Sequence, residues 1–364
     1  MNTTTPVFSK NDNLKFFRTL NSRVNNYFKE NNLDKTGNWK LHLKTIVMFT
    51  IFLTPYFILL AMDMPFWAYL LLNVVIGIGM AGVGMNVMHD GNHGSYSNKS
   101  WVNKIMGGSI YILAGNVYNW QVQHNVLHHT YTNILGHDED LEAGRILRFS
   151  KTAKWYRFHK FQHYYSIFLY GLLTFNWAIT TDFLQMKRYL KRNLSYGEFK
   201  KPAIRWTTLI ITKVIYFSIW LVLPMVMGIS WWKVVLGFLV MHYTAGVILS
   251  VVFQLAHVVE DTHNPVPDEN GEIENTWAIH QLFTTANFAP KNWLVNYYTG
   301  GLNHQIEHHI FPNISHIHYG KIAEIVKQTA KECELPYYEF KTTRAAIISH
   351  FKHLKELGRQ PQLA

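Results

Sequence analysis

The chain has 364 residues, enough for one large domain or two smaller ones. Its formal net charge is +11 and 15% of its residues are aromatic. We assign the basic balance to an anionic membrane surface and expect no nucleic-acid partner, because apolar stretches interrupt the basic segments. The single cysteine, Cys333, excludes an intramolecular disulfide and a Cys-x-x-Cys metal site. Any metal site would therefore use carboxylates and the 20 histidines.

The first 44 residues are polar and lack the apolar core and cleavage site of a signal peptide, so we expect a cytosolic N-terminal segment over residues 1–44. Four apolar stretches follow, each close to the ~20 residues that a helix needs to cross ~30 Å of hydrocarbon. They cover residues 45–62, 66–88, 207–227 and 234–256. Short turns within each pair predict two transmembrane hairpins.

Between the hairpins, residues 105–117 and 167–180 are apolar but too short for spans, and we interpret them as interfacial or buried helices. Residues 151–165 mix Lys, Arg, Trp, Tyr and His, which is typical of a helix on a membrane surface. The pattern of residues 321–364 predicts an amphipathic helical tail.

The distribution of Lys and Arg predicts the orientation in the membrane. Only Lys213 and Lys233 fall in the second hairpin, and none falls in the first turn. By the positive-inside rule, both termini and the long middle segment are cytosolic. We therefore predict an all-α integral-membrane domain over residues 45–320, with four transmembrane helices and a cytosolic helical cap.

Three histidine clusters lie on the predicted cytosolic side, at residues 89–93, 124–129 and 304–309. Positions i and i+4 share a helix face, so each cluster can present imidazoles to one ion. The candidate ligands are His89, His93, His124, His128, His129, His308 and His309. Either His304 or Gln305 supplies the first position of the third cluster.

A single pair of histidines four residues apart is weak evidence for a metal site. His159 and His163 have this spacing, and we interpret them as interfacial residues. His257 closes the fourth apolar stretch at the predicted cytosolic boundary, where a histidine is a functional candidate, so we predict an eighth ligand there. We interpret His242, deeper in that stretch, as a hydrogen-bonded core residue.

Seven or more imidazoles are too many for one ion and predict two metals. The His-Glu-x-x-His motif of zinc proteases is absent. The Glu-x-x-His motif of soluble carboxylate di-iron proteins occurs only once, from Glu260 to His263. A zinc-dependent membrane hydrolase stays open as an alternative. A metal transporter ranks last, because only Lys213 and His242 are ionisable within the spans.

With their flanks, the three clusters resemble the histidine boxes of the membrane fatty-acid desaturase family, over roughly residues 40–320. Residues 130–133 and 138–140 extend the likeness of the second box, and residues 300–312 contain the third. Gln305 in place of the first histidine is similar to the front-end and acyl-lipid branch of the family. Residues 277–289 are also similar to the family.

The resemblance implies an O₂-dependent enzyme that inserts a cis double bond into a long acyl chain, carried by CoA, acyl carrier protein or lipid. It implies two iron ions (Fe²⁺/Fe³⁺) held by histidines, and it supports His257, since the family takes one ligand from the end of the fourth span. A lipid hydroxylase with the same metals is the nearest alternative. We expect five acids to orient ligand imidazoles through their second ring nitrogen, namely Asp90, Asp138, Asp140, Asp261 and Glu307.

Many front-end enzymes carry a fused cytochrome b5 domain with a His-Pro-Gly-Gly motif. This chain lacks the motif, and 44 residues are too few for that domain. We therefore expect a separate electron donor of the ferredoxin or cytochrome b5 type with its reductase. The expected location is the bacterial inner membrane or the endoplasmic reticulum, with the active site cytosolic and the acyl substrate among membrane lipids.

Overall fold

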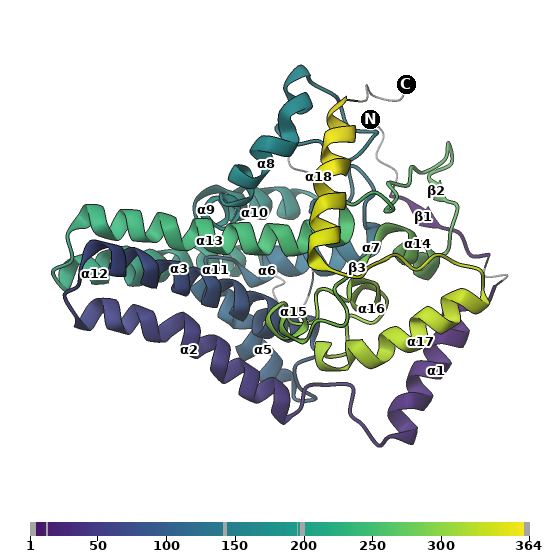
Figure 1. The fold of residues 1–364 in the computed structure, drawn as a ribbon, viewed down its shortest axis with the longest axis horizontal. Coiled ribbons are helices and arrows are strands. Elements are labelled where there is room, and N and C mark those ends of the chain that lie inside the picture. Colours follow the sequence, from purple (N-terminus) through teal and green to yellow (C-terminus); the bar gives the residue numbers. More distant parts are fainter. Residues whose placement is uncertain (1–4, 12–13, 141–143, 195, 197–200, 360–364) are drawn as a thin grey trace. The chain divides into compact units, whose positions relative to one another are not determined.

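The structure is a computed structural model that describes residues 5–11, 14–140, 144–194, 196 and 201–359 (Figure 1). Most of the described chain is helical, which confirms the expected helical class. Its strands form two short parallel pairs, β1 (Val7–Phe8) with β2 (Glu272–Ile273) and β3 (Asn287–Phe288) with β4 (Glu339–Phe340).

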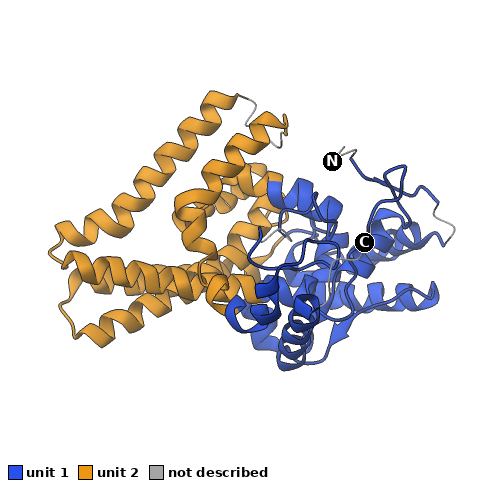
Figure 2. Ribbon diagram, turned by 90° about the horizontal axis from the view of Figure 1, so that it is seen from above, with its two compact units in different colours: residues 1–36, 123–166, 252–364 blue, residues 37–122, 167–251 orange. Residues whose placement is uncertain are grey.

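The chain divides into two compact units, which Figure 2 shows in different colours. Unit 1 contains residues 1–36, 123–166 and 252–364, and unit 2 contains residues 37–122 and 167–251. Each unit thus combines segments that are far apart in the sequence. The two are described separately below.

Four helices, most of whose residues lie in unit 2, are long and apolar enough to cross a membrane. They cover Trp39–Ala61, Phe66–His93, Pro202–Val226 and Trp231–His257. Four such helices were expected, and the structure begins the first, third and fourth several residues earlier than the apolar composition does. The elements are α2 (Trp39–Ala61), α3 (Phe66–Val83), η1 (Gly84–Met88), α4 (His89–His93), α11 (Pro202–Phe217), η6 (Ser218–Val222), α12 (Leu223–Val226) and α13 (Trp231–His257).

Helix α3 packs closely against α2 and α13 because two of its residues have no side chain. A Cβ atom on Gly79 would lie 2.5 Å from the backbone nitrogen of Phe52 in α2. A Cβ atom on Gly77 would lie 2.5 Å from the carbonyl oxygen of Met241 in α13. Small residues allow this approach of helix backbones in a membrane, where dispersion contacts replace the hydrophobic effect.

The weaker apolar stretches form short helical segments. Residues 105–117 lie in α5 and η2 and at the start of α6, and residues 113–120 are buried throughout. The helices Arg157–Tyr170 and Leu173–Lys191 meet the length and composition of a span only together, and they are bent by 64°. The elements are α5 (Ser100–Gly108), η2 (Ser109–Leu113), α6 (Val117–Trp120), α8 (Gln162–Tyr170), α9 (Leu173–Asn176), η5 (Trp177–Thr181) and α10 (Asp182–Lys191).

Lys213 and His242, which lie well inside the spans of unit 2, are buried with partners. The ammonium group of Lys213 lies 2.7 Å from a carboxylate oxygen of Asp182. His242 Nε2 lies 2.7 Å from the hydroxyl oxygen of Tyr216, and its Nδ1 lies 2.9 Å from that of Thr174. The interpretation of His242 as a hydrogen-bonded core residue is confirmed.

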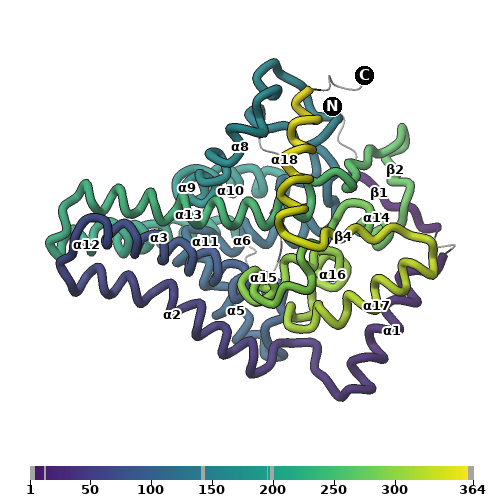
Figure 3. The backbone as a smooth tube through the Cα atoms, viewed as in Figure 1, coloured from purple at the N-terminus to yellow at the C-terminus, as the bar shows by residue number. Residues whose placement is uncertain are grey.

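Helix α1 (Phe16–Glu30) of unit 1 is amphipathic, with its apolar residues four apart. Phe16, Leu20, Val24 and Phe28 are buried in one core with residues of α17 (Tyr319–Glu332), and the two helices lie side by side in Figure 3. Arg23 of α1 donates hydrogen bonds to the hydroxyl of Thr329 and the carboxylate of Glu332 on α17. The predicted N-terminal segment and C-terminal tail therefore meet in one core.

Further helices belong wholly or mostly to unit 1. They are η3 (Gln121–His128), which starts in unit 2, and α7 (His129–Tyr131), η4 (Arg157–Phe161), α14 (Trp277–Thr284), α15 (Trp293–Tyr298), α16 (Gln305–Ile310), η7 (His316–His318) and α18 (Thr343–Arg359).

The close approach of α2 and α3 predicts that Gly79→Ala destabilises the protein. The added methyl group forces the Phe52 backbone away, and overpacking of this kind costs about 1–3 kcal/mol. We expect a fall of several degrees in the thermal midpoint of the purified protein. The matched control is Gly320→Ala in α17, where a Cβ atom meets nothing within 4 Å and the midpoint should stay equal or rise. Equal midpoints for both variants would contradict this packing.

Candidate metal centre

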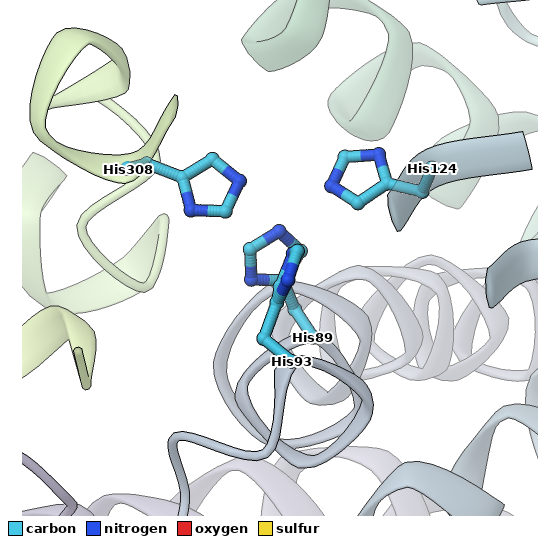
Figure 4. A group of neighbouring side chains, drawn as sticks. All are labelled: His89, His93, His124 and His308. Atoms are coloured by element: carbon cyan, nitrogen blue, oxygen red, sulfur yellow. The ribbon is translucent and has the colours of Figure 1, made fainter. Parts of the chain in front are cut away.

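The first histidine cluster belongs to unit 2 and lies at the end of a long apolar helix. His89 and His93 stand on α4 with ring centroids 4.6 Å apart, and Figure 4 shows both imidazoles on the same side of that helix. The indole of Trp120 meets both rings edge to face, at 5.7 and 5.6 Å. Asn92 donates hydrogen bonds to the carbonyl oxygens of Met88 and Gly107. As predicted, the i, i+4 pair shares one face.

The second cluster differs from the expected α-helix. Residues 121–128 form a π-helix, in which positions i and i+5 align. His124 Nε2 accordingly lies 3.2 Å from Nε2 of His129, five residues on. The wider turn also keeps the ring of His124 close to that of His128, with centroids 5.2 Å apart. His128 was expected to align with His124, but the ring of His129 is the nearer of the two.

His257, the last residue of α13, lies in unit 1 with the second and third clusters. Its ring centroid is 4.7 Å from that of His128 and 4.9 Å from that of His309. Its Nδ1 lies 3.3 Å from the carbonyl oxygen of Thr284. Its Nε2 and that of His128 are buried and have no hydrogen-bond partner among the described residues, as befits atoms that could bind a metal.

The third cluster lies on α16. Nδ1 of His308 lies 3.1 Å from the hydroxyl oxygen of Tyr319, and Nδ1 of His309 lies 2.9 Å from the amide oxygen of Gln281. The ring of His308 faces that of His124 with centroids 5.8 Å apart, as Figure 4 also shows. Gly301, with φ of +68°, leaves room for the Tyr319 ring that contacts His308. A Cβ atom on Gly301 would lie 3.1 Å from that ring.

Unit 1 brings its candidate ligands together in three groups. In each group the potential ligand atoms lie within 4.8 Å of one another. The groups are His128 with His257 and His309, His129 with His308 and His309, and His124 with His128 and Asp140.

Asp138 fixes the orientation of His128. Its two carboxylate oxygens lie 3.1 and 3.0 Å from Nδ1 of His128. They also accept hydrogen bonds from the backbone N–H groups of Asn133 and Asp140. Burial alone lowers the pKa of His128, but the charge and hydrogen bond of Asp138 outweigh it, with help from Asp140, and raise that pKa.

Asn133 connects the second cluster to the end of α13. Its backbone has a φ of +60°, a left-handed conformation that asparagine tolerates better than most residues. From there its side-chain amide donates hydrogen bonds to the carbonyl oxygens of His257, His263 and Thr284. The Thr284 carbonyl is the same oxygen that lies near Nδ1 of His257.

His304 and Gln305 compete for the first position of the third cluster, and neither belongs to the three groups of unit 1. His304 is buried, with its Nδ1 3.7 Å from a carboxylate oxygen of Glu307. The amide oxygen of Gln305 is buried without a hydrogen-bond partner among the described residues. The carboxylate of Glu307 accepts hydrogen bonds from Asn287 and Tyr337.

The other predicted orienting acids lie in different surroundings. A carboxylate oxygen of Asp140 lies 3.6 Å from Nδ1 of His124, and burial raises the pKa of this acid to about 6. Asp90 is buried, with an oxygen 3.9 Å from Nδ1 of His89. Asp261 is exposed, and its charge acts on Tyr338, whose pKa is raised by burial and by this acid.

His159 and His163 differ from the clusters, as expected, but His159 is not interfacial. It is buried, its Nε2 lies 2.9 Å from the carbonyl oxygen of Arg145, and its Nδ1 accepts a hydrogen bond from the backbone N–H of Tyr156. Nδ1 thus helps to cap the short helix η4, and Nε2 contacts the preceding segment of the chain. The interfacial interpretation of this residue is wrong because its neighbours, and not its own ring, are exposed.

Several residues that orient the ligands were not predicted. Gln281 and Asn133 stand in stretches that resemble the family, but the sequence indicates no role for them. Tyr319 lies eleven residues after His308, and no spacing rule connects a phenol to a histidine across a loop. Thr284 acts through its backbone carbonyl, which any residue has.

The donor set of unit 1 fits a transition metal. Neutral imidazole suits iron, zinc, copper and nickel, and ligating histidines usually have their second ring nitrogen held by an oxygen. Four imidazoles of unit 1 have this arrangement, and two have a buried Nε2 without a partner among the described residues. This chemistry differs from that of a solvated group of histidines.

Comparisons with known proteins identify a family that fits this histidine-rich site. A family model described as fatty acid desaturase matches residues 64–341. The sn-1 linoleoyl-lipid 6-desaturase of Arthrospira platensis is 35% identical, over 100% of this chain and 98% of that protein. The enzyme of the same name from Synechocystis sp. is 35% identical over 94% of this chain and 96% of its own.

The acyl-lipid (8-3)-desaturase of Physcomitrium patens is 32% identical, over 95% of this chain and 72% of that protein. The matched region contains three of the four apolar helices and all three histidine clusters, and only the first helix, Trp39–Ala61, precedes it. Family match, relatives and histidine geometry lead to one conclusion: the chain belongs to the fatty acid desaturase family and is an oxidoreductase of lipid metabolism.

Proposed function

We propose that the protein is an O₂-dependent acyl-lipid desaturase that inserts a cis double bond into a long acyl chain at a histidine-ligated di-iron centre. The observation that carries the proposal is the set of four imidazoles in unit 1 whose Nδ1 is held by a protein oxygen. Such histidines present Nε2 as the ligand atom.

The proposed iron ligands are histidines of the three clusters and of the end of α13. They are His89, His93, His124, His128, His129, His257, His308 and His309, with His304 or Gln305 as a possible ninth. Unactivated methylene C–H bonds are beyond acid–base chemistry, and bound iron supplies the oxidation with O₂. The protein holds the ligands in one tautomer: Asp138, Gln281, Tyr319 and the Thr284 carbonyl fix the rings.

We propose an acyl chain esterified in a membrane lipid as substrate. The relatives are named for lipid-linked acyl chains, and Gln305 occupies the position that resembles the acyl-lipid branch. The same branch suggests that the new double bond lies between the carboxyl end and an existing double bond. Electrons would come from a separate ferredoxin or cytochrome b5 type of donor.

We propose that residues 45–320 form the membrane domain in two hairpins, with residues 1–44 and 321–364 and the active site on the cytosolic side. Two observations support this arrangement. The helices α1 and α17 share one core, which supports a location of both terminal segments on the same side of the membrane. His257 ends its span within that same unit.

Replacement of a proposed ligand should remove iron as well as activity. We expect His309→Ala to abolish desaturation and to lower the iron content, measured by elemental mass spectrometry per mole of folded protein. His263→Ala is the matched control, because His263 is exposed. His159→Ala should lower thermal stability while the folded fraction keeps its iron. Full iron in His309→Ala would contradict the assignment.

Substitutions of Asp138 and Asp261 should have very different effects on metal affinity. Asp138→Asn removes the carboxylate that orients His128, and loss of such a partner typically weakens metal binding about 10–100-fold. Titration with a competing chelator would measure this change. Asp261→Asn should leave the affinity unaltered, because that acid is exposed. Equal effects of the two substitutions would argue against this geometry.

The proposed activity predicts a defined product. Expression in a host that makes no polyunsaturated lipid, with linoleate supplied, should yield acyl chains that have lost two hydrogens. Gas chromatography with mass spectrometry would locate the new double bond, expected on the carboxyl side of the existing ones, in the intact lipid fraction. Gain of one oxygen would instead identify a hydroxylase. Activity that persists without O₂, with zinc bound, would identify a hydrolase.

A further inference from the structure

Residues 144–181, which include η4 and α8, have an unusual excess of positive charge. Residues 144–181 contain six Lys and Arg residues and no Asp or Glu. Arg148 is buried and donates hydrogen bonds to backbone carbonyls, whereas Lys151, Lys154, Arg157 and Lys160 are exposed. A basic stretch without a single acid favours an anionic partner.

Aromatic side chains stand between these cations. Phe158, Phe161 and Tyr164 follow one another at intervals of three residues along η4 and α8. They are 45%, 61% and 68% exposed. Helical residues three apart are neighbours on one side, so the three rings form a stripe. We call this stripe, with Lys154, Arg157 and Lys160, the basic–aromatic face.

The opposite side of the segment is fixed in place by helix α18. Trp155 donates a hydrogen bond of 2.7 Å to the carbonyl oxygen of Gly358, and Gln162 donates one of 2.8 Å to that of Leu354. Arg148 donates one of 2.6 Å to that of Leu357. The bonds to Leu357 and Gly358 satisfy two of the last carbonyls of α18. The rings are therefore exposed on an ordered scaffold, and α18 adds the exposed cations Lys352, Lys355 and Arg359.

We propose that the basic–aromatic face binds the headgroups of anionic phospholipids and inserts its aromatic rings into the bilayer interface. Aromatic rings interleaved with Lys and Arg on one helix face are the composition of interfacial membrane helices. The positive charge matches phosphate groups, and the apolar stripe matches the boundary between headgroups and acyl chains. A soluble acidic protein would match the charge but would leave three apolar rings without an apolar environment.

The site differs from the metal centre, and the test does not require catalysis. A Cys333→Ser chain has no other cysteine, so Phe161→Cys in that background takes one environment-sensitive fluorophore. The full-length, iron-loaded protein in mixed micelles of neutral detergent is titrated with phosphatidylglycerol or phosphatidylcholine. We expect a blue shift of the emission that saturates at much lower mole fractions of phosphatidylglycerol.

The charge contribution is tested in the same labelled chain. Each Lys or Arg near an anionic surface changes affinity by roughly fivefold, so K154Q/R157Q/K160Q should weaken phosphatidylglycerol binding on the order of a hundredfold. The matched control K29Q/K331Q/K341Q removes three exposed lysines of the same unit outside this face and should bind as the parent does. Thermal melting would verify that both variants are folded.

Three results would overturn the proposal. Equal titration curves for the two lipids, or equal binding by the two triple variants, would show that the face does not recognise anionic headgroups. A blue shift produced by an added acidic redox protein, with none produced by phosphatidylglycerol, would identify the face as a protein-docking surface instead.

Discussion

In unit 1, four imidazoles have a protein oxygen at Nδ1, and this contact is the constraint on which the candidate metal centre depends. A proton held on Nδ1 by such an oxygen leaves the lone pair of Nε2 available to a metal. Four different groups supply these oxygens: the carboxylate of Asp138, the carbonyl of Thr284, the hydroxyl of Tyr319 and the amide of Gln281. These groups and the candidate ligands that they contact come from separate segments of the chain.

The fold of unit 1 brings these segments together. Helix α17 supplies Tyr319 from its first position, and the same helix packs on α1 through a shared apolar core. Asn133 adopts a left-handed conformation and connects the loop of Asp138 to the end of α13. A buried polar network of this kind stabilises one arrangement strongly, because each group left without its partner would cost about 1–3 kcal/mol.

Composition and spacing were sufficient for some features of the molecule. Long apolar runs predict membrane helices because helix length follows bilayer thickness, and repeated clusters indicate a metal site. The π-helix over residues 121–128 was not predictable, because the spacing of its histidines also fits an α-helix. Local spacing does not reveal i→i+5 hydrogen bonds. His159 shows the converse: its spacing matches the clusters, but only the structure shows that one ring nitrogen caps a helix and the other contacts the carbonyl of Arg145. Tyr319 joins the site through the tertiary fold, which no local pattern encodes.

The partners of the imidazoles are also chemically unequal. His128 faces a carboxylate, whereas His308 faces a phenol and His309 an amide. A carboxylate increases the basicity of the opposite ring nitrogen more than a neutral oxygen does, so His128 is the strongest donor of these three. Glu307 does not offset this difference, because its carboxylate accepts hydrogen bonds from Asn287 and Tyr337 and lies near His304, and not near these three rings. The asymmetry therefore arises from the second histidine cluster, where Asp138 and its loop lie, and two metals bound by these rings would not be equivalent.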